Sequence, residues 1–289
     1  MTITERARAK VNLTLRVLGR RPDGYHEVES LVAFADAADE VAFEPGLPPV
    51  VTVSGPYADD IVGLNIAAAT LAELANVEPR LTLGSVHIIK NLPVAAGIGG
   101  GSANAAAVLR AVRQANPARA RQTDWEAVAR KLGADVPVCL LDRAVIMRGL
   151  GERLEPISLP ALPAVLVNAM AQVPADKTAR VFKALAAAPL SDSPAQHGPT
   201  VPAFRQAADV TAFMRQAGND LAAASETIVP QLADVLHALG TETRALATTM
   251  SGAGPTCVAL FSTDAEASAA AAALAIAHPG WWVVPTTLR

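Results

Sequence analysis

The chain has 289 residues, of which 51% are hydrophobic, so it is long enough to bury the core of one large domain or of two ordinary ones. Its 24 lysine and arginine residues are outnumbered by 27 aspartate and glutamate residues, and the resulting net charge of −3 disfavours a nucleic-acid partner. No stretch approaches the roughly 20 apolar residues that span a bilayer, so we expect neither a signal peptide nor a membrane partner.

The first ninety residues are predicted to be mostly β-structure. Residues 9–18 alternate apolar and polar side chains, as in a strand with one buried face, and residues 19–24 form a predicted turn. Lys10 and Asn12 share one face of this strand. Further strands are predicted at 28–34, 39–43, 49–54 and 81–89. A helix is expected near 64–76, with an apolar stripe at Leu64, Ala67, Ala68, Leu71 and Leu74.

A glycine-rich segment, from Pro93 to Ser102, leads from the last of these strands into a helix that stops at Asn116-Pro117. Four of its residues are glycines: Gly97, Gly99, Gly100 and Gly101. Because they have no Cβ atoms, the backbone N–H groups at the helix start stay open to an anion, which indicates a phosphate-binding loop. We expect Ser102 to cap the helix and to offer its hydroxyl to a phosphate oxygen or a metal-bound water. The alternative is a purely structural glycine turn.

Two other kinds of phosphate loop are excluded by their spacing. A Walker loop ends in Gly-Lys-Ser/Thr, and this segment has no lysine. A dinucleotide fingerprint needs a glycine at its sixth position, where this chain has Ser102.

Beyond the loop, a second helix is predicted to begin with the capping box Thr123-x-x-Glu126 and to end at Gly133, and Asp135 then heads a buried apolar run. The proline-rich segment 155–163 places a domain boundary near residue 156, which gives domains 1–156 and 157–289. Later elements are a strand at 164–169, helical structure over 182–219 interrupted at 190–202, a helix at 226–239, a strand at 256–261, a helix at 264–277 and a strand at 281–285. This order favours an α+β sandwich with helices on one face.

The cysteines and histidines point to no metal centre. Cys139 and Cys257 lie in apolar runs, which is typical of buried free thiols in a reduced cytoplasmic protein. The histidines His87, His197, His237 and His278 are too scattered to suggest a metal site. We therefore expect only Mg²⁺ that arrives with a nucleotide, through ligands that the sequence leaves unknown.

Four motifs that occur together resemble those of the GHMP kinases. Residues 93–106 match the phosphate loop of that family, although Ala103 stands where a second hydroxyl is usual. The other motifs are Ala9-Lys10-Val11-Asn12-Leu13, Arg21-Pro22-Asp23-Gly24-Tyr25-His26 and Gly133-Ala134-Asp135-Val136-Pro137, and the segment Ser251–Pro255 fits as well. Together they resemble the branch of the family that acts on a cytidine-diphosphate-linked sugar alcohol.

This resemblance implies a fold and a reaction. The fold is the two-domain α/β (α+β) GHMP kinase fold, with an N-terminal domain like the second domain of ribosomal protein S5 and a C-terminal ferredoxin-like α/β sandwich. The reaction is the ATP-dependent phosphorylation of the 2-hydroxyl of 4-diphosphocytidyl-2-C-methyl-D-erythritol, in the non-mevalonate (MEP) route to isoprenoid precursors. The partners are small molecules only.

The resemblance also assigns roles to single residues. Lys10 and Asp135 act on the acceptor hydroxyl. The cytidine substrate contacts Asn12, Tyr25, His26, Asp135, Thr178 and Phe182, although the segment after Asn168 is longer and less similar than in the family. ATP contacts Asn65, Lys90, Pro93, Val94, Ala95, Ala96, Gly97, Ile98, Gly99, Gly100, Gly101, Ser102 and Asn104.

Plainer readings of these residues stay open. Without the resemblance, each residue has a simpler interpretation. Asp135 would cap a turn, and Lys10 would be a solvated residue of a strand. Lys90 would be a surface charge, and Asn65 would cap a helix. A GHMP kinase for homoserine or a mevalonate-like alcohol is a second hypothesis, but those substrates bring no base to stack on Tyr25. A nucleotide-binding regulatory protein without turnover is a third, which the retention of Lys10 and Asp135 disfavours.

Overall fold

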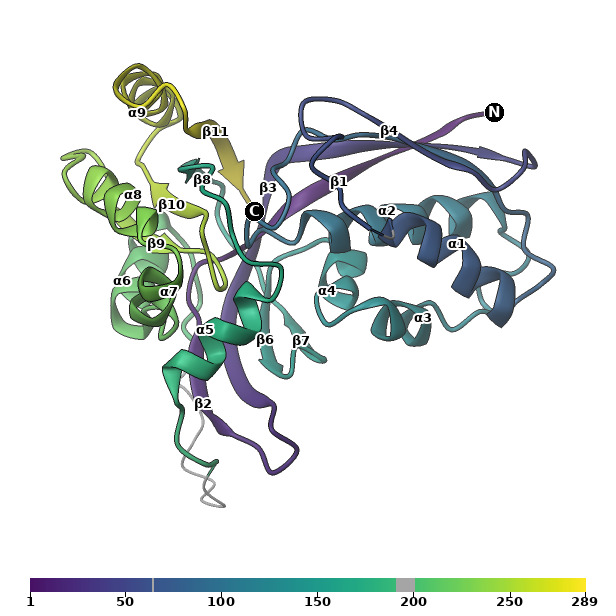
Figure 1. The fold of residues 1–289 in the computed structure, drawn as a ribbon, viewed down its shortest axis with the longest axis horizontal. Coiled ribbons are helices and arrows are strands. Elements are labelled where there is room, and N and C mark those ends of the chain that lie inside the picture. Colours follow the sequence, from purple (N-terminus) through teal and green to yellow (C-terminus); the bar gives the residue numbers. More distant parts are fainter. Residues whose placement is uncertain (64, 191–200) are drawn as a thin grey trace. The chain divides into compact units, whose positions relative to one another are not determined.

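The computed structural model describes residues 1–63, 65–190 and 201–289 (Figure 1). The chain folds into two compact units, both of which mix helices and strands, so the expected α+β class is confirmed. The first unit consists of Met1–Lys10, Ala37–Val94 and Gly99–Asp142. The second unit consists of Val11–Asp36, Ala95–Ile98 and Arg143–Arg289. These units are discontinuous in the chain, whereas the domains predicted with a boundary near residue 156 are continuous, and that boundary stays a prediction.

In its described part, the first unit combines a small sheet with four helices. Its strands are β1 (Ile3–Asn12), β3 (His26–Pro45), β4 (Val51–Ser54) and β5 (Gly84–Ile89), of which β1 and β3 run on into the second unit. Its helices are α1 (Ile66–Val77), α2 (Gly100–Ala115), α3 (Trp125–Leu132) and α4 (Val136–Leu141). The sheet has the order β4-β5-β3, with β4 parallel to β5, and β1 also pairs with β3. The buried alanine-rich face of α2 packs against α1 and α4, which fixes the position of its first turn.

The second unit is built on an antiparallel sheet. Its further strands are β2 (Arg16–Arg20), β6 (Val145–Gly149), β7 (Arg153–Pro156), β8 (Leu162–Asn168), β9 (Ala247–Met250), β10 (Cys257–Leu260) and β11 (Trp282–Leu288). The order is β3-β11-β8-β10-β9, and β2 and β6 pair with the N-terminal part of β3. Strand β8 is buried over nearly its whole length and lies at the centre of this sheet.

Among the residues that the structure describes, five helices complete the second unit. They are α5 (Lys177–Leu185), α6 (Ala207–Ala217), α7 (Ala222–Ile228), α8 (Gln231–Gly240) and α9 (Asp264–Ala277). Helix α9 packs against β8 and β11, and α8 packs against β8, β9 and β10 (Figure 1). Their apolar residues join Val165, Val167 and Phe261 in one buried cluster, as an α+β sandwich requires.

Several strand and helix predictions need correction. The strands predicted at 28–34 and 39–43 are one strand, β3, whereas the strand predicted at 9–18 divides into β1 and β2. The helix predicted at 226–239 is two helices, because Pro230 has no backbone N–H to continue α7. The helix at 264–277 is confirmed as α9. Leu64, His197 and most of the predicted interruption at 190–202 lie outside the described residues.

Two predicted helix caps are also wrong. Helix α2 begins at Gly100 with Gly99 as its N-cap, in the left-handed conformation, so Ser102 lies inside the first turn. Helix α3 is capped by Asp124, whose side chain accepts a hydrogen bond from the N–H of Ala127, and not by Thr123.

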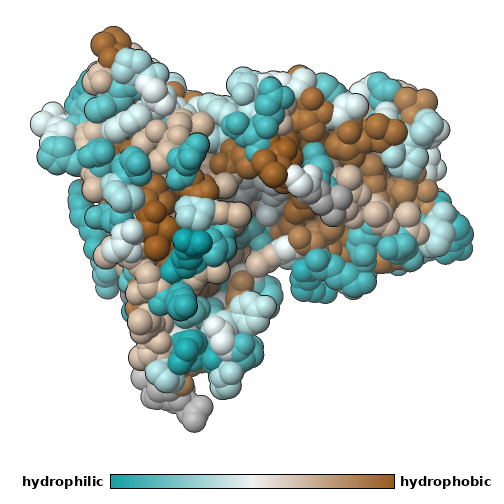
Figure 2. All heavy atoms as spheres, viewed as in Figure 1, coloured by the Kyte–Doolittle hydropathy of each residue, from teal (hydrophilic) through white to brown (hydrophobic). Residues whose placement is uncertain are grey.

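The surface carries exposed apolar residues. On the face shown in Figure 2, brown apolar residues gather in patches that teal hydrophilic residues border. The large apolar side chains with the greatest exposure include Met1, Val62 and Ile276. Within the described residues, the structure contains no helix with the length and hydrophobicity needed to cross a membrane.

Candidate active site

An ion pair in the first unit brings the two predicted catalytic residues together. The Nζ atom of Lys10 lies 3.1 Å from Oδ2 of Asp135, and the lysine side chain is only 5% exposed while the aspartate side chain is 38% exposed. Asp135 occupies the N-cap position of α4, but its side chain makes no capping hydrogen bond. The carboxylate therefore pairs with Lys10 and does not cap the turn, and one side of it stays open to solvent.

The start of α2 lies directly against Lys10. A Cβ atom at Gly99 would lie 3.3 Å from Cβ and 3.4 Å from Cε of Lys10, and Gly99 has a φ of 65°. Glycine meets both demands, since it has no side chain and tolerates a positive φ. The paired carboxylate and ammonium thus lie beside a helix N-terminus, where unpaired N–H groups favour an anion.

A second ion pair, in which both side chains are buried, fixes the segment that leads into the glycine loop. Asp39, whose side chain is fully buried, accepts a hydrogen bond from Lys90 Nζ at 2.6 Å and one from Asn104 Nδ2 at 2.9 Å. It also accepts from the backbone N–H groups of Asn91 and Leu92, at 2.7 and 2.8 Å. Sequence reasoning missed Asp39, because its partners lie more than 50 residues away and no local motif marks it.

Lys90 is therefore a buried residue and not a surface charge. Its side chain is 4% exposed, and burial lowers its pKa although Asp39 favours the charged form. A Cβ atom at Gly100 would lie 3.2 Å from its Nζ atom, so the ammonium lies beside the first turn of α2. Two predicted ATP residues, Lys90 and Asn104, are thus joined by one carboxylate at the start of this helix.

Asn65 has the role of a helix cap. Its side-chain oxygen accepts a hydrogen bond from the N–H of Ala67 at 2.9 Å, at the start of α1. A contact with adenosine through the rest of the side chain stays a prediction.

In the second unit, residues 95–98 of the glycine loop are fixed through their carbonyl groups. The oxygen of Ala95 accepts a hydrogen bond from Lys177 Nζ at 3.4 Å. The oxygen of Ala96 accepts from the N–H of Thr256 at 3.1 Å, and that of Gly97 accepts from Ser251 Oγ at 3.1 Å. Three consecutive carbonyls are thus tied to residues far along the chain.

Close packing accompanies these hydrogen bonds. Gly97 has a φ of 77°, and a Cβ atom there would lie 2.3 Å from the carbonyl oxygen of Gly254. Within the described residues, the N–H groups of Ala96, Gly97 and Ile98 have no hydrogen-bond acceptor. This part of the loop therefore keeps its amides available for a ligand.

Asn12 lies in the same unit, with its side chain buried. Its Nδ2 donates to Ser30 Oγ at 2.7 Å, and its backbone N–H donates to Ser251 Oγ at 3.0 Å. Ser251 thus connects Asn12 to the carbonyl of Gly97 in the glycine loop. The glycine-rich segment 251–255 therefore serves as a support for the residues predicted to bind the substrates.

The residues predicted for the cytidine substrate are partly together. His26 stacks on Phe182, with ring centroids 4.8 Å apart and an angle of 29° between the planes. Burial, with Arg20 as a lesser cause, lowers the pKa of His26, so the imidazole is neutral near pH 7. Tyr25 is 64% exposed, and Thr178 is exposed in the first turn of α5. His26 and Phe182 are thus in contact, while the roles of Phe182, Tyr25 and Thr178 in substrate binding stay predictions.

The remaining predicted residues continue the loop. Pro93 is buried, whereas Val94 is 37% exposed. Gly101 is exposed and Ser102 is half-buried, both in the first turn of α2.

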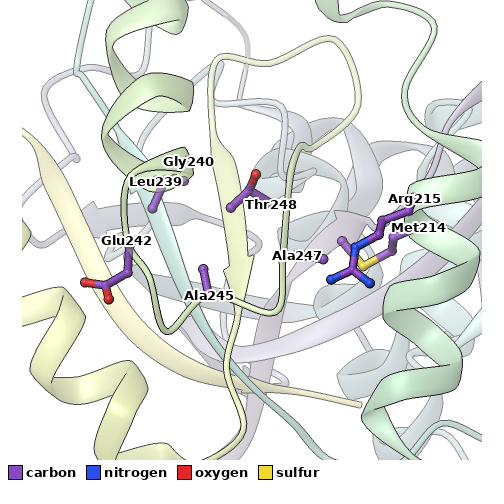
Figure 3. Close-up of a pocket in the computed structure, with 8 residues that line it drawn as sticks. All are labelled: Met214, Arg215, Leu239, Gly240, Glu242, Ala245, Ala247 and Thr248. Carbon is purple, nitrogen blue, oxygen red and sulfur yellow. The ribbon is translucent and has the colours of Figure 1, made fainter.

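A separate pocket of about 260 Å³ opens between α6, α8 and β9 (Figure 3). Its two charged residues are engaged elsewhere: Arg215 donates to the carbonyl of Leu246, and Glu242 pairs with Arg244 at 2.7 Å. The Arg244 side chain holds the pKa of Glu242 below its usual value. None of the site residues predicted from the sequence lines this pocket. Because both of its charged side chains are already engaged, the pocket offers no free charged group to a ligand.

Comparison with known proteins gives two family matches and many similar kinases. The family described as "GHMP kinases N terminal domain" matches residues 59–143, and "GHMP kinases C terminal" matches residues 200–280. A 4-diphosphocytidyl-2-C-methyl-D-erythritol kinase of Rhodopseudomonas palustris is 46% identical over 98% of this chain and 96% of its own length. One of Methylobacterium radiotolerans is 47% identical over 99% of each chain.

Two solved structures are similar to this chain over nearly its whole length. A crystal structure of 4-(cytidine 5'-diphospho)-2C-methyl-D-erythritol kinase matches with a TM-score of 0.77 and 32% identity over 99% of each chain. A homoserine kinase from Cytophaga hutchinsonii matches with a TM-score of 0.68 at 19% identity, over 99% of this chain and 94% of that one. The second similarity indicates the fold alone.

Proposed function

The chain belongs to the GHMP kinase family, and we propose that it transfers the γ-phosphoryl group of ATP to the 2-hydroxyl of 4-diphosphocytidyl-2-C-methyl-D-erythritol. It is a small-molecule kinase with the GHMP kinase fold, and its relatives over the full chain carry the name of the kinase for this substrate. The reaction is a step of the MEP route to isoprenoid precursors.

The main support for the proposal is the ion pair between the buried ammonium of Lys10 and the half-exposed carboxylate of Asp135. Lys10 lies directly against Gly99, at the start of α2. Phosphoryl transfer depends on positioning and on charge stabilisation around a loose transition state. A base, a cation and a helix N-terminus at one place supply these requirements.

In the proposed mechanism, Asp135 orients the acceptor hydroxyl and accepts its proton as the new P–O bond forms. The bond between the γ-phosphorus and the β,γ-bridging oxygen breaks, and the electron pair leaves with ADP. Lys10 holds the Asp135 carboxylate in place through the ion pair and offsets negative charge on the transferred group.

The substrate-binding residues follow the same proposal. Tyr25 stacks on the cytosine, His26 on its Phe182 support offers a neutral ring nitrogen, and Asn12 and Thr178 contact the rest of the substrate. ATP binds through residues 93–102 and Asn104, with Asn65 and Lys90 near adenosine. This assignment rests on the loop carbonyls held by Ser251 and Thr256, which leave the loop amides to the phosphates.

We propose that Mg²⁺ arrives with ATP, where it neutralises phosphate charge. Among the described residues, no group of three or more His, Cys, Asp or Glu side chains lies close enough together to hold a metal ion. We also propose a cytoplasmic location, in keeping with the two buried free cysteines.

The test is turnover by the purified protein. With ATP, Mg²⁺ and 4-diphosphocytidyl-2-C-methyl-D-erythritol, we expect release of ADP and a new phosphomonoester signal in ³¹P NMR spectra. The Asp135→Asn variant should lower kcat about 100-fold or more. Asp234→Asn, which removes an exposed carboxylate from α8, is the matched control and should keep full activity. Turnover of homoserine or mevalonate in place of the cytidine substrate would contradict the proposal.

A further inference from the structure

Lys177 is a buried lysine of the second unit without a carboxylate partner among the described residues. Its side chain is almost fully buried, and its Nζ atom donates to two backbone carbonyls, those of Gly254 and Ala95. The neighbouring Asp176 carboxylate pairs with Arg180 at 2.7 Å instead. Burial of an ammonium group without a counter-charge costs free energy, so a buried Lys177 is expected to have a role that offsets this cost.

The position of Lys177 in its helix adds to this cost. Lys177 is the first residue of α5, where the helix dipole is positive and disfavours a cation. Burial lowers its pKa to about 8, so the amine is mostly charged at neutral pH and loses its proton in mild alkali.

Few other charges are available to explain that pKa. The loop segments 95–98 and 251–256, which contain its two acceptors, carry no charged side chain. Helix α7, which packs against α5, contributes Glu226, and on α5 itself Arg180 is held by Asp176. Burial is therefore the cause of the low pKa.

The two acceptors show what Lys177 does. Ala95 belongs to the glycine loop and Gly254 to the segment 251–255, so one ammonium joins both. In a trans peptide, the N–H group points away from the C=O group of the same plane. When the carbonyl of Ala95 turns toward Lys177, the N–H of Ala96 turns toward the opposite side, as a phosphate ligand requires.

We propose that Lys177 is a positioning residue for nucleotide binding, whose charged amine ties the Ala95 end of the glycine loop to the segment 251–255 and so orients the loop amides toward the phosphates of ATP. The inference rests on the proposed use of this loop for ATP. It adds a residue from the segment after Asn168.

The experiment measures the Kd of ATP by isothermal titration without acceptor substrate, at pH 7 and pH 9. At pH 7, Lys177→Met should bind ATP at least about tenfold more weakly than the wild type, the scale of one charge-assisted hydrogen bond. The ratio of the two Kd values should shrink at pH 9, because the wild-type amine is then mostly neutral. Lys183→Met, which removes an exposed lysine from the same helix, should leave the Kd unchanged.

Circular dichroism and a thermal melt establish that each variant is folded. If Lys177→Met does not fold, Lys177→Arg takes its place, and its permanent charge should keep the Kd constant from pH 7 to pH 9. Equal affinity of a folded Lys177→Met and the wild type at pH 7 would overturn the inference, as would a ratio that stays the same at both pH values. Loss of ATP affinity by Lys177→Arg with pH, parallel to that of the wild type, would do so too.

The outcome is independent of the proposed reaction. Failure of the wild type to phosphorylate the cytidine substrate would contradict the proposed function and leave the ATP measurement intact.

Discussion

Replacement of Asp39 by asparagine tests whether the buried carboxylate holds the entrance of the glycine loop. The introduced amide would keep the shape of the side chain but lose its charge and one acceptor oxygen. In the native protein that carboxylate serves four donors: Lys90 Nζ, Asn104 Nδ2 and the N–H groups of Asn91 and Leu92. The variant leaves the Lys90 ammonium buried without its counter-charge.

The size of the effect follows from burial. The side chains of Lys90 and Asp39 are 4% and 0% exposed, and loss of one partner of such a pair costs about 3–5 kcal/mol. Lys131 and Glu73 form an exposed pair of similar length, 2.8 Å, with a lysine that is 64% exposed. Glu73→Gln should therefore cost less than about 1 kcal/mol.

Urea denaturation followed by circular dichroism gives the free energy of unfolding for each variant, and the KM for ATP gives the functional effect. We expect Asp39→Asn to lower the unfolding midpoint strongly and to raise the KM for ATP. Addition of Lys90→Met to Asp39→Asn should recover part of the lost free energy of unfolding, so the two substitutions should show a coupling energy of about 1 kcal/mol or more. A destabilisation by Asp39→Asn no larger than that by Glu73→Gln would refute the reasoning.

Three further expectations concern binding and reactivity. Tyr25→Ala should raise the KM for the cytidine substrate far more than that for ATP, because the exposed ring offers a face to the base; equal effects in steady-state kinetics would count against stacking. Since burial lowers the pKa of His26 below its usual 6.5, the KM for the cytidine substrate should rise on acidification with a midpoint below pH 6.5; a midpoint above pH 6.5 would contradict this. Burial raises the thiol pKa of Cys139 and Cys257, so both should resist thiol reagents in the native protein and react after denaturation; rapid labelling without unfolding would be inconsistent with their burial.

Local sequence patterns predicted the elements whose ends are marked by a capping residue or by a clear break in the apolar spacing. The bounds of α9 follow from Thr263, whose side chain caps the helix, and from the apolar spacing that ends before the next strand. Residues 35–38 carry no alternation, so the sequence predicts two strands. In the structure β3 pairs with β6 at 28–32 and with β5 at 40–45, and it runs unbroken between them. Pairing with other strands thus extends β3 through residues whose local sequence does not predict a strand.

The candidate site was predictable to the extent that its residues belong to short motifs. Lys10, Asp135 and the glycine loop each lie in a recognisable run of residues, and the structure pairs the first two. Asp39 and Lys177 lie in no such run, since their partners are more than 50 and more than 70 residues away. Their roles depend on contacts that only the fold creates, so the sequence alone gives no sign of them.

The three anchored carbonyls of the glycine loop have a consequence for synthesis in the cell. Residues 95–97 leave the ribosome long before their donors, Lys177, Ser251 and Thr256, are translated. A growing chain therefore carries the loop without its restraints until residue 256 has been made. If the loop binds ATP as proposed, we expect nucleotide binding to begin only after that point of translation.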